Sequence, residues 1–167
     1  LFPRPAQNDL PLAVFVTTSG GLVGGDRLEL SVRSEAATSV MITAQAAEKI
    51  YRSNGADSTI EVTLTCDADA WLEWLPQETI LFDQSQLART IEIDIDATSE
   101  CLVLESLVFG RHAMCEVLAN CHFTDRWRIR RDGQLVHAEA VRLNENVGGL
   151  LGASAGAAGA QMATTCV

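Results

Sequence analysis

The sequence predicts an all-β protein of two layers of stacked sheets, resembling a short β-helix or a sandwich, with little helix. Three observations support this fold class. Apolar and polar residues alternate with a period of two along much of the chain. The alternation recurs about every thirty residues, each time followed by a small-residue turn and an apolar strand. Helical periodicity is confined to short segments. At 167 residues we expect one domain with its own core.

The first part of the chain alternates between two kinds of strand. One kind has an apolar and a polar face, which is typical of a strand buried on one side. The other kind is a continuous apolar run, which predicts a strand covered on both sides. From these patterns and the repeat we expect stacked layers of mainly antiparallel strands. The alternating segments are Leu28–Val32, Ile60–Leu64 and Ile91–Ile95, and the apolar runs include Ala13–Val16, Val40–Ile42 and Leu102–Leu104.

The second part of the chain contains a hairpin signal at Asp132-Gly133, between two strand patterns, Arg126–Arg131 and Gln134–Leu143. An earlier segment, Ala44–Tyr51, predicts either a short helix or a turn that enters a strand.

The domain prediction is a single domain over residues 1–167. Within it we expect a strand-rich core at 1–146 and a Gly/Ala-rich connector or loose helix at 147–161. Residues 162–167 have the pattern of a further strand that begins there. The opening LFPRP resembles a linker, and an unpaired last strand would be a liability. We therefore expect the domain to be incomplete at both ends.

Composition excludes several classes of partner. The chain has 22 acidic and 12 basic residues, a formal net charge of −10. Phosphate backbones and anionic membranes repel such a chain at long range, so we expect neither nucleic acid nor a membrane as partner. Its five cysteines include no CxxC pair, and there is no signal sequence or apolar run of membrane-spanning length. These features predict reduced thiols and a cytoplasmic location.

A glycine-rich segment, TTSGGLVGGDRLEL, lies at Thr17–Leu30. It is not a phosphate-binding loop, because Gly25 is followed by Asp26 and Arg27 where such a loop has lysine and a hydroxyl residue. Its glycines predict a tight turn with positive φ. The side chain of Asp26 could bond the turn backbone, or it could point into a cavity. The sequence leaves both possibilities open.

Other acids stand in unusual surroundings. Glu73 lies between Trp71 and Trp74, with Glu78 nearby, and such a pair could act as acid and base in a hydrolase. Strand alternation favours an outward, structural Glu73.

Two further acids interrupt strands that should otherwise be covered. Glu105 lies within Leu102–Phe109, and Glu139 lies in the return strand of the hairpin. A covered acid is costly unless it is hydrated, paired or bound to a cation. Each could therefore line a wet channel, or form a salt bridge with an arginine.

One group of residues has the chemistry of nickel or zinc ligands: His112, Cys115, Cys121 and His122. Their spacing is irregular, and the adjacent Cys121 and His122 would point to opposite faces of a strand. We therefore favour a structural interpretation of this group.

Four segments, in this order, resemble the UreD (UreH) family of urease accessory proteins: SGGLVGGDRL at Ser19–Leu28, TAQAAEKIYRS at Thr43–Ser53, LEWLPQETILF at Leu72–Phe82 and ESLVFGRHAMCE at Glu105–Glu116. Two positions depart from the family pattern. Cys115 stands where glycine is usual, and Glu48 where a small polar residue is usual.

The resemblance implies a non-enzymatic, β-helix-like maturation factor. It implies docking on urease apoprotein and on UreF, with the GTPase UreG bound through UreF. It also implies that nickel passes through as transient cargo, with no permanently bound cofactor. On that view Asp26, Glu105 and Glu139 would line the nickel path. The alternatives are a β-scaffold for protein interaction without metal handling, and a carboxylate-dependent hydrolase.

Overall fold

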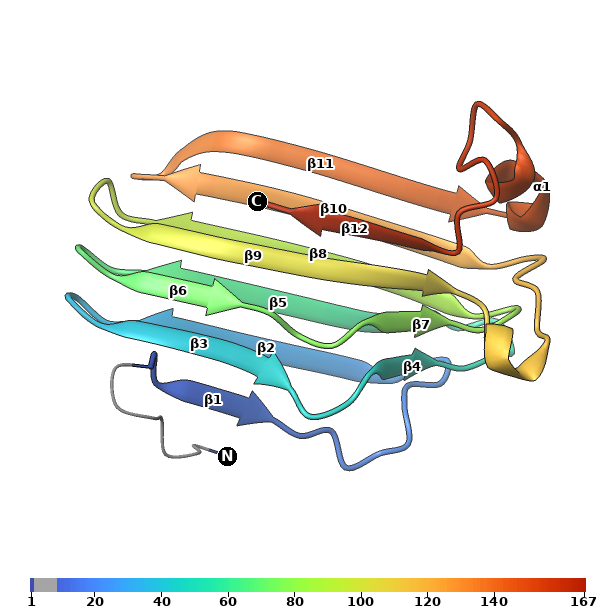
Figure 1. Cartoon of the computed structure of the whole chain (residues 1–167), viewed down its shortest axis with the longest axis horizontal. Coiled ribbons are helices and arrows are strands. Elements are labelled where there is room, and N and C mark those ends of the chain that lie inside the picture. The colour runs from blue at the N-terminus through green and yellow to red at the C-terminus, as the bar shows by residue number, and fades with distance from the viewer. Residues whose placement is uncertain (2–8) are drawn as a thin grey trace.

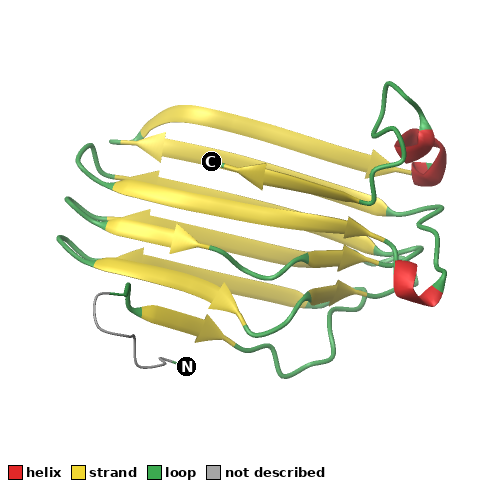
Figure 2. Cartoon of the chain, viewed as in Figure 1, coloured by secondary structure: helices red, strands yellow, loops and turns green. Residues whose placement is uncertain are grey.

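The computed structural model describes Leu1 and residues 9–167, the side chain of His112 excepted. Strands dominate this part of the chain (Figure 2), which also contains a 3-10 turn at His112–Met114 and one short helix, α1 (Val147–Gly152). In chain order the strands are β1 (Leu12–Phe15), β2 (Arg27–Ser34), β3 (Ser39–Ala44), β4 (Glu48–Ile50), β5 (Ser58–Cys66), β6 (Trp71–Trp74), β7 (Thr79–Leu81), β8 (Gln86–Ile95), β9 (Glu100–Phe109), β10 (His122–Arg131), β11 (Gln134–Asn144) and β12 (Met162–Cys166).

The strands form two sheets that face each other, which confirms the predicted two-layer, all-β fold (Figure 1). The five-stranded sheet has the order β11-β10-β8-β5-β2. In the seven-stranded sheet β1, β3, β6 and β9 are neighbours, β4 and β7 continue the lines of β3 and β6, and β12 pairs with β9. From β2 to β10 the chain passes alternately from one sheet to the other, as in a β-helix.

The predicted repeat is confirmed as three coils of this helix. Each coil has one strand in the five-stranded sheet, a tight turn, and one continuous or interrupted strand in the other sheet: β2 with β3 and β4, β5 with β6 and β7, and β8 with β9. Equivalent bonds close the three turns, from Thr38 N to Glu35 O, Ala70 N to Asp67 O, and Ser99 N to Asp96 O.

The prediction of mainly antiparallel neighbours is wrong. Within each sheet the coils pair in parallel, and among the strands that the structure describes the antiparallel pairs are β10 with β11 and β9 with β12. The reason is topological. A strand that turns into the opposite sheet meets its neighbour one coil later, when the chain again runs in the same direction.

Parallel register stacks equivalent side chains between the sheets. Leu30 lies beside Val62, which lies beside Ile91, and Leu72 of the other sheet is fully buried. These residues belong to one hydrophobic cluster that contains core side chains of both sheets. The core therefore has the stacked character that the period-two alternation predicts.

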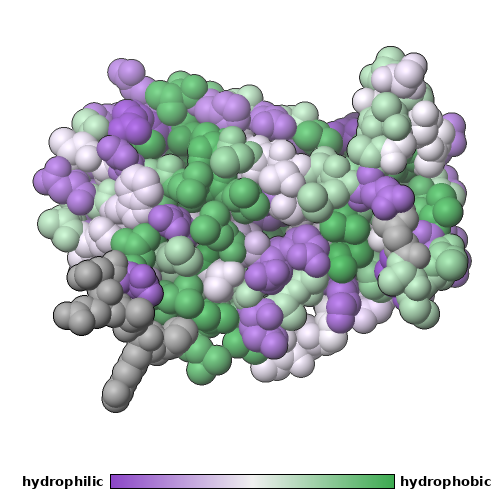
Figure 3. All heavy atoms as spheres, in the orientation of Figure 1, coloured by the Kyte–Doolittle hydropathy of each residue, from purple (hydrophilic) through white to green (hydrophobic). Residues whose placement is uncertain are grey.

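The outer faces of the two sheets differ. The five-stranded sheet presents charged residues such as Arg27, Glu61 and Glu92. The seven-stranded sheet presents half-buried apolar side chains, among them Met41, Ile80, Leu102, Leu104 and Val108. Figure 3 views this second face and shows hydrophobic side chains gathered on it. The apolar runs were expected to be covered on both sides. In the described residues only their inner side is fully covered.

The remaining predictions concern the ends of the core. Asp132-Gly133 closes the predicted hairpin between β10 and β11, and Met162–Cys166 forms the predicted last strand. Ala44–Tyr51 is not helical, because the chain ends β3, bends and enters β4. Most of the LFPRP segment lies outside the described residues. The described residues contain no helix with the length and apolar character needed to cross a bilayer.

Candidate functional site

The seven-stranded sheet has an interruption in its first two coils. β9 runs without a break, and its residues Val103 and Leu107 pair with Trp74 and Thr79 of the neighbouring coil. Four residue steps along β9 therefore lie opposite five steps in that coil. In the first coil the equivalent residues are Ile42 and Glu48, which pair with Trp74 and Thr79 and are six residue steps apart. The extra residues form bends, at Leu75–Glu78 and at Gln45–Ala47. Pro76 lies in the first bend, where it cannot donate a ladder bond.

A small cavity of about 30 Å³, which we call the inner cavity, lies between the sheets at this interruption. Its walls are mainly apolar, with Phe15 and Trp74 on one side and Leu30 and Val62 on the other. The polar groups that reach it include Glu48, Arg89, Glu105, Gln77 and Thr79. A second cavity of about 190 Å³, which we call the outer cavity, shares Phe15, Ala44, Ala46 and Glu48 with the first. It is otherwise lined by the glycine turn and the bend after β3.

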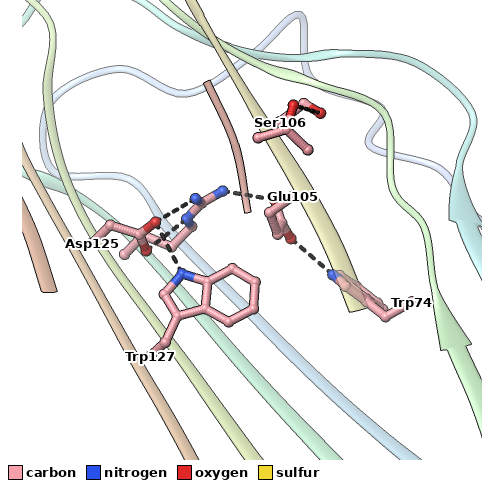
Figure 4. A network of polar contacts seen from close by, with 7 residues as sticks. Trp74, Glu105, Ser106, Asp125 and Trp127 are labelled. Atoms are coloured by element: carbon pink, nitrogen blue, oxygen red, sulfur yellow. Dashed lines mark hydrogen bonds and ion pairs between the residues drawn. The ribbon is translucent and has the colours of Figure 1, made fainter. Parts of the chain in front are cut away.

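The inner cavity ends on a buried cluster of charges (Figure 4). Arg89 of β8 donates from Nε to Asp125 Oδ1 at 3.0 Å, from Nη2 to Asp125 Oδ2 at 2.6 Å, and from Nη1 to Glu105 Oε2 at 2.7 Å. The indole N–H of Trp74 donates to Glu105 Oε1 at 2.8 Å, and that of Trp127 to Asp125 Oδ2 at 3.1 Å. The exposed fractions of Arg89, Glu105 and Asp125 are 3%, 5% and 3%.

The cluster contains one guanidinium and two carboxylates, so it is one negative charge in excess when all three are ionised. Burial raises the pKa of Glu105, and Arg89 and the Trp74 indole only partly offset this. Burial also works against the charged form of Arg89, but Glu105 and Asp125 hold its pKa above the ordinary value. Glu105 therefore gains a proton more readily than an exposed carboxylate does.

Glu48 is a second carboxylate that lines the same cavity as Glu105. It lies at the start of β4, is half-buried, and accepts a hydrogen bond from Thr17 Oγ1 at 3.1 Å. Burial raises its pKa, opposed by that hydroxyl and by Lys49. Since Glu48 lines both cavities, it stands between the glycine turn and the cavity that contains Glu105.

Arg89 and Asp125 were not among the residues that the sequence singled out. A signal was present, because Arg89 falls in phase with Leu87 and Ile91, and Asp125 with Phe123 and Trp127. A charged residue in the buried phase of a strand needs a partner. The pairing of Arg89 with Glu105 is one of the two alternatives left open for that acid.

Of the two roles that the sequence left open for Asp26, the structure shows the first: its side chain bonds the backbone of the glycine turn. Its Oδ2 accepts a hydrogen bond from Val23 N at 2.9 Å, and its own N–H donates to Val23 O at 3.0 Å. The turn requires positive φ at Gly21 and Gly25, as predicted. Asp26 lines neither of the two cavities.

Glu139 lies on β11, the edge strand opposite to β2 in the five-stranded sheet. It faces Trp127 across the strand pair, and its Oε2 lies 3.7 Å from His137 Nε2. The structure thus does not bring Asp26, Glu105 and Glu139 together in one site. Their part in nickel transfer stays a prediction.

The acids considered for a hydrolase are also separate. Glu73 lies on the outer side of β6 and accepts a hydrogen bond from Trp71 Nε1 at 3.0 Å. Among the described residues no polar contact joins it to Glu78.

The histidine and cysteine group forms no metal site in the described part of the chain, where no cluster of three or more His, Cys, Asp and Glu residues could hold a metal ion. Cys121 is buried and its neighbour His122 is exposed. Burial raises the pKa of the Cys121 thiol to about 12, which makes thiolate chemistry there unfavourable. The side chain of His112 lies outside the described residues.

Comparison with known proteins shows which family this sequence matches. The sequence model of the UreD urease accessory proteins matches residues 1–167. The chain is 48% identical over 159 residues to "Urease accessory protein UreD" of Rhodopseudomonas palustris (strain BisB18), covering 95% of this chain and 57% of that protein. It is 46% identical over 159 residues to "Urease accessory protein UreD 3" of a Bradyrhizobium species, covering the same shares.

A relative from Rhizobium leguminosarum bv. trifolii, also named urease accessory protein UreD, is 46% identical over 138 residues, which is 83% of this chain and 50% of that protein. The chain therefore spans about half the length of the curated relatives it matches. A match over the whole chain, with identities near one half, leads to a single assignment: the chain belongs to the UreD family of urease accessory proteins.

Proposed function

We propose that this chain acts in the cytoplasm as a non-catalytic urease maturation factor. It docks on urease apoprotein and on UreF, with UreG bound through UreF, and nickel passes through it as transient cargo. The observation that carries the nickel part is the placing of two carboxylates, Glu48 and Glu105, on one cavity between the sheets. Family membership supports the role in urease maturation.

Carboxylates suit transient passage. Nickel binds oxygen ligands less tightly than sets of thiolate and imidazole, so a carboxylate route can release what it takes up. When all three groups of the Arg89, Glu105 and Asp125 cluster are ionised, its excess negative charge favours a cation close by. Glu48 lines both the inner cavity and the outer one at the glycine turn. In this proposal Glu105 and Glu48 are the principal carboxylates, and Asp26 and Glu139 contribute at the two edges of the five-stranded sheet.

The outer face of the seven-stranded sheet supports docking. Leu102, Leu104 and Val108 of β9 are half-buried on this face, next to Ile80 of β7 and Met162 of β12. Contiguous apolar surface on a folded protein typically marks a protein interface. It offers urease or another accessory protein a flat apolar surface.

The test uses Glu105→Gln and Glu48→Gln, with Glu73→Gln as the matched control, because Glu73 lies on the outer face. Urease apoprotein is matured with the accessory proteins, and its nickel content per active site is measured by mass spectrometry. We expect both cavity variants to lower the nickel content while the complex still co-purifies. Normal nickel loading in both cavity variants would contradict the nickel route.

A scaffold without metal handling is the second candidate. It is favoured by the full pairing of Glu105, whose two oxygens already accept from Trp74 and Arg89. Nickel titration calorimetry separates the two candidates. A nickel carrier gives a heat of binding that Glu48→Gln and Glu105→Gln reduce, whereas a pure scaffold gives none.

A further inference from the structure

The positive charge of this acidic chain is concentrated on the β10–β11 hairpin. Five of the twelve Lys and Arg residues lie between His122 and Asn144, whereas the whole chain has a net charge of −10. Three of them, Arg126, Arg128 and Arg130, alternate with the buried residues of β10 and therefore point outward. A fourth, Arg142, is exposed on β11.

Strand register places these arginines on one flat surface. Arg142 stands opposite Thr124, Arg126 opposite Ala140, and Arg128 opposite Ala138. Arg126 and Arg142 are thus diagonal neighbours across the pair, a separation of about 7–8 Å. Small residues lie between the arginines, so nothing bulky shields the guanidinium groups from a partner. We call this surface, Thr124, Arg126, Arg128, Ala138, Ala140 and Arg142, the arginine face.

The charge of the arginine face is only partly neutralised. Arg130, at its border, pairs with Glu92 at 3.1 Å and Asp94 at 4.0 Å, and Arg128 lies 3.8 Å from Glu92. Within the described residues neither Arg126 nor Arg142 takes part in an ion pair. The acids of the hairpin lie elsewhere: Asp125 is buried against Arg89, Asp132 is in the turn, and Glu139 stands opposite the buried Trp127, on the other face of the strand pair.

Protection of a sheet edge is the simpler explanation for exposed charges, because edge strands often contain them to prevent aggregation. It accounts for Arg142 on the edge strand β11. It does not account for Arg126 and Arg128, which lie on β10, one strand inside the edge. Their alignment with Arg142 across the pair requires another reason.

We infer that the arginine face is a docking surface for an acidic protein surface. A guanidinium binds a carboxylate through two parallel hydrogen bonds, and Arg is enriched in protein interfaces for this reason. Nucleic acid is disfavoured because the rest of the chain repels phosphate. One part of the inference rests on the proposed function, namely that the acidic partner belongs to the urease assembly. The arginine face and the apolar face lie on opposite outer sides of the two-layer body, so the two can be occupied together.

The experiment compares three chains: wild type, Arg126→Glu/Arg142→Glu, and Arg27→Glu/Arg33→Glu. The last pair makes the same change in net charge on the outer face of the same sheet, but on β2 at the opposite edge. Each chain is mixed with purified urease apoprotein, UreF and UreG, and dissociation constants are measured at 50 and 300 mM NaCl. Circular dichroism confirms folding. A 20-residue polyglutamate peptide and a 20-base-pair DNA duplex serve as simple acidic probes.

We expect the arginine-face variant to bind at least one of the three proteins about tenfold more weakly at low salt, and to lose the salt dependence of the wild type. The β2 control should bind about as the wild type does. The inference is overturned if the arginine-face variant binds all partners as the wild type does, or if DNA binds the face as well as polyglutamate. It is also overturned if the variant only abolishes self-association.

If the wild type binds none of the three proteins, the proposed function fails. The arginine face is then judged by polyglutamate alone. Binding to the wild type and not to the variant supports the inference, and equal or absent binding overturns it.

Discussion

At the scale of single residues, the buried charge cluster is the feature with the largest energetic consequences. Ionised groups lose several kcal/mol of hydration when buried, and only good geometry recovers it. Here all the oxygens of Glu105 and Asp125 accept a bond from Arg89 or an indole N–H. The cluster is stable as a unit, and Arg89 is the member whose loss leaves two carboxylates unpaired.

Arg89→Met is therefore expected to lower the free energy of unfolding by about 3–5 kcal/mol. Urea denaturation measures this change. The control is Arg130→Ala, which removes a partly exposed pair with Glu92 and should cost less than about 1 kcal/mol. Removing all three charges together, in Arg89→Met/Glu105→Gln/Asp125→Asn, should recover much of the loss. A small effect of Arg89→Met would mean that water hydrates the cluster.

The raised pKa of Glu105 predicts a pH dependence. The folded state keeps this proton at pH values at which the unfolded chain, with a pKa of about 4.3, has lost it. The associated stability is complete below the unfolded pKa and is lost as the pH rises through the folded pKa. The free energy of unfolding of Glu105→Gln minus that of the wild type should therefore increase from pH 4 upward and then level off.

Urea titrations at unit steps from pH 4 to pH 8 test this. Glu73→Gln, on the outer face, controls for the general effect of losing an acid. A difference between Glu105→Gln and wild type that stays constant over this range would exclude a coupled proton at Glu105.

At the scale of elements, the two bends of the seven-stranded sheet create the site. The strand patterns Val40–Ile42 and Leu102–Leu104 predicted strands correctly, and a turn entering a strand was one of the two predictions for Ala44–Tyr51. No local signal showed how many residues each bend would contain relative to β9. Those residues matter only relative to β9, which continues without a bend. The number of residues between two paired positions differs from coil to coil, and this difference can be seen only once the coils are aligned side by side. Tertiary structure therefore decides where the cavity opens.

The glycine turn is the element that closes the outer cavity. Gly21 has φ +138°, and a Cβ there would overlap the carbonyl oxygen of Lys49, which accepts the N–H of Leu22 at 2.8 Å. Gly25 has φ +91° with open space around it. Gly25→Ala should cost about 1–2 kcal/mol from backbone conformation alone. Gly21→Ala should cost more, because it also displaces the bond that joins the turn to β4.

Thermal unfolding of the two glycine variants, side by side, separates backbone strain from steric overlap. Equal losses would show that the bridge between Leu22 and β4 adds no stability. A larger loss in Gly21→Ala should be accompanied by faster amide exchange at Leu22 and Tyr51, whose N–H groups make the two bridging bonds.

At the scale of the whole molecule, the two outer sheet faces have different chemistry. The five-stranded sheet is charged and the seven-stranded sheet is apolar, and the net charge of −10 keeps copies apart at neutral pH. Near the isoelectric point of about 4.6 this repulsion vanishes. The apolar face then becomes the surface through which copies associate.

Self-association is therefore expected to increase as the pH falls from 8 toward 5, and Leu102→Ser/Leu104→Ser should reduce it. Sedimentation velocity measures the effect. Leu135→Ser is the control, because Leu135 is exposed on β11, away from the apolar face. If the double variant associates as the wild type does, the apolar face is not the contact surface.

The sequence by itself determined the two-layer strand architecture, the hairpin at Asp132-Gly133, the last strand and the family. These features depend on local periodicity, turn chemistry and sequence similarity. It also identified Glu105 as an acid in a covered strand. Only the tertiary structure decided that neighbouring coils run in parallel, and that Arg89, 16 and 36 positions away from Glu105 and Asp125, pairs with both. The physical reason is that a side chain's partners across a coil and between sheets are set by register, which no local stretch of sequence contains.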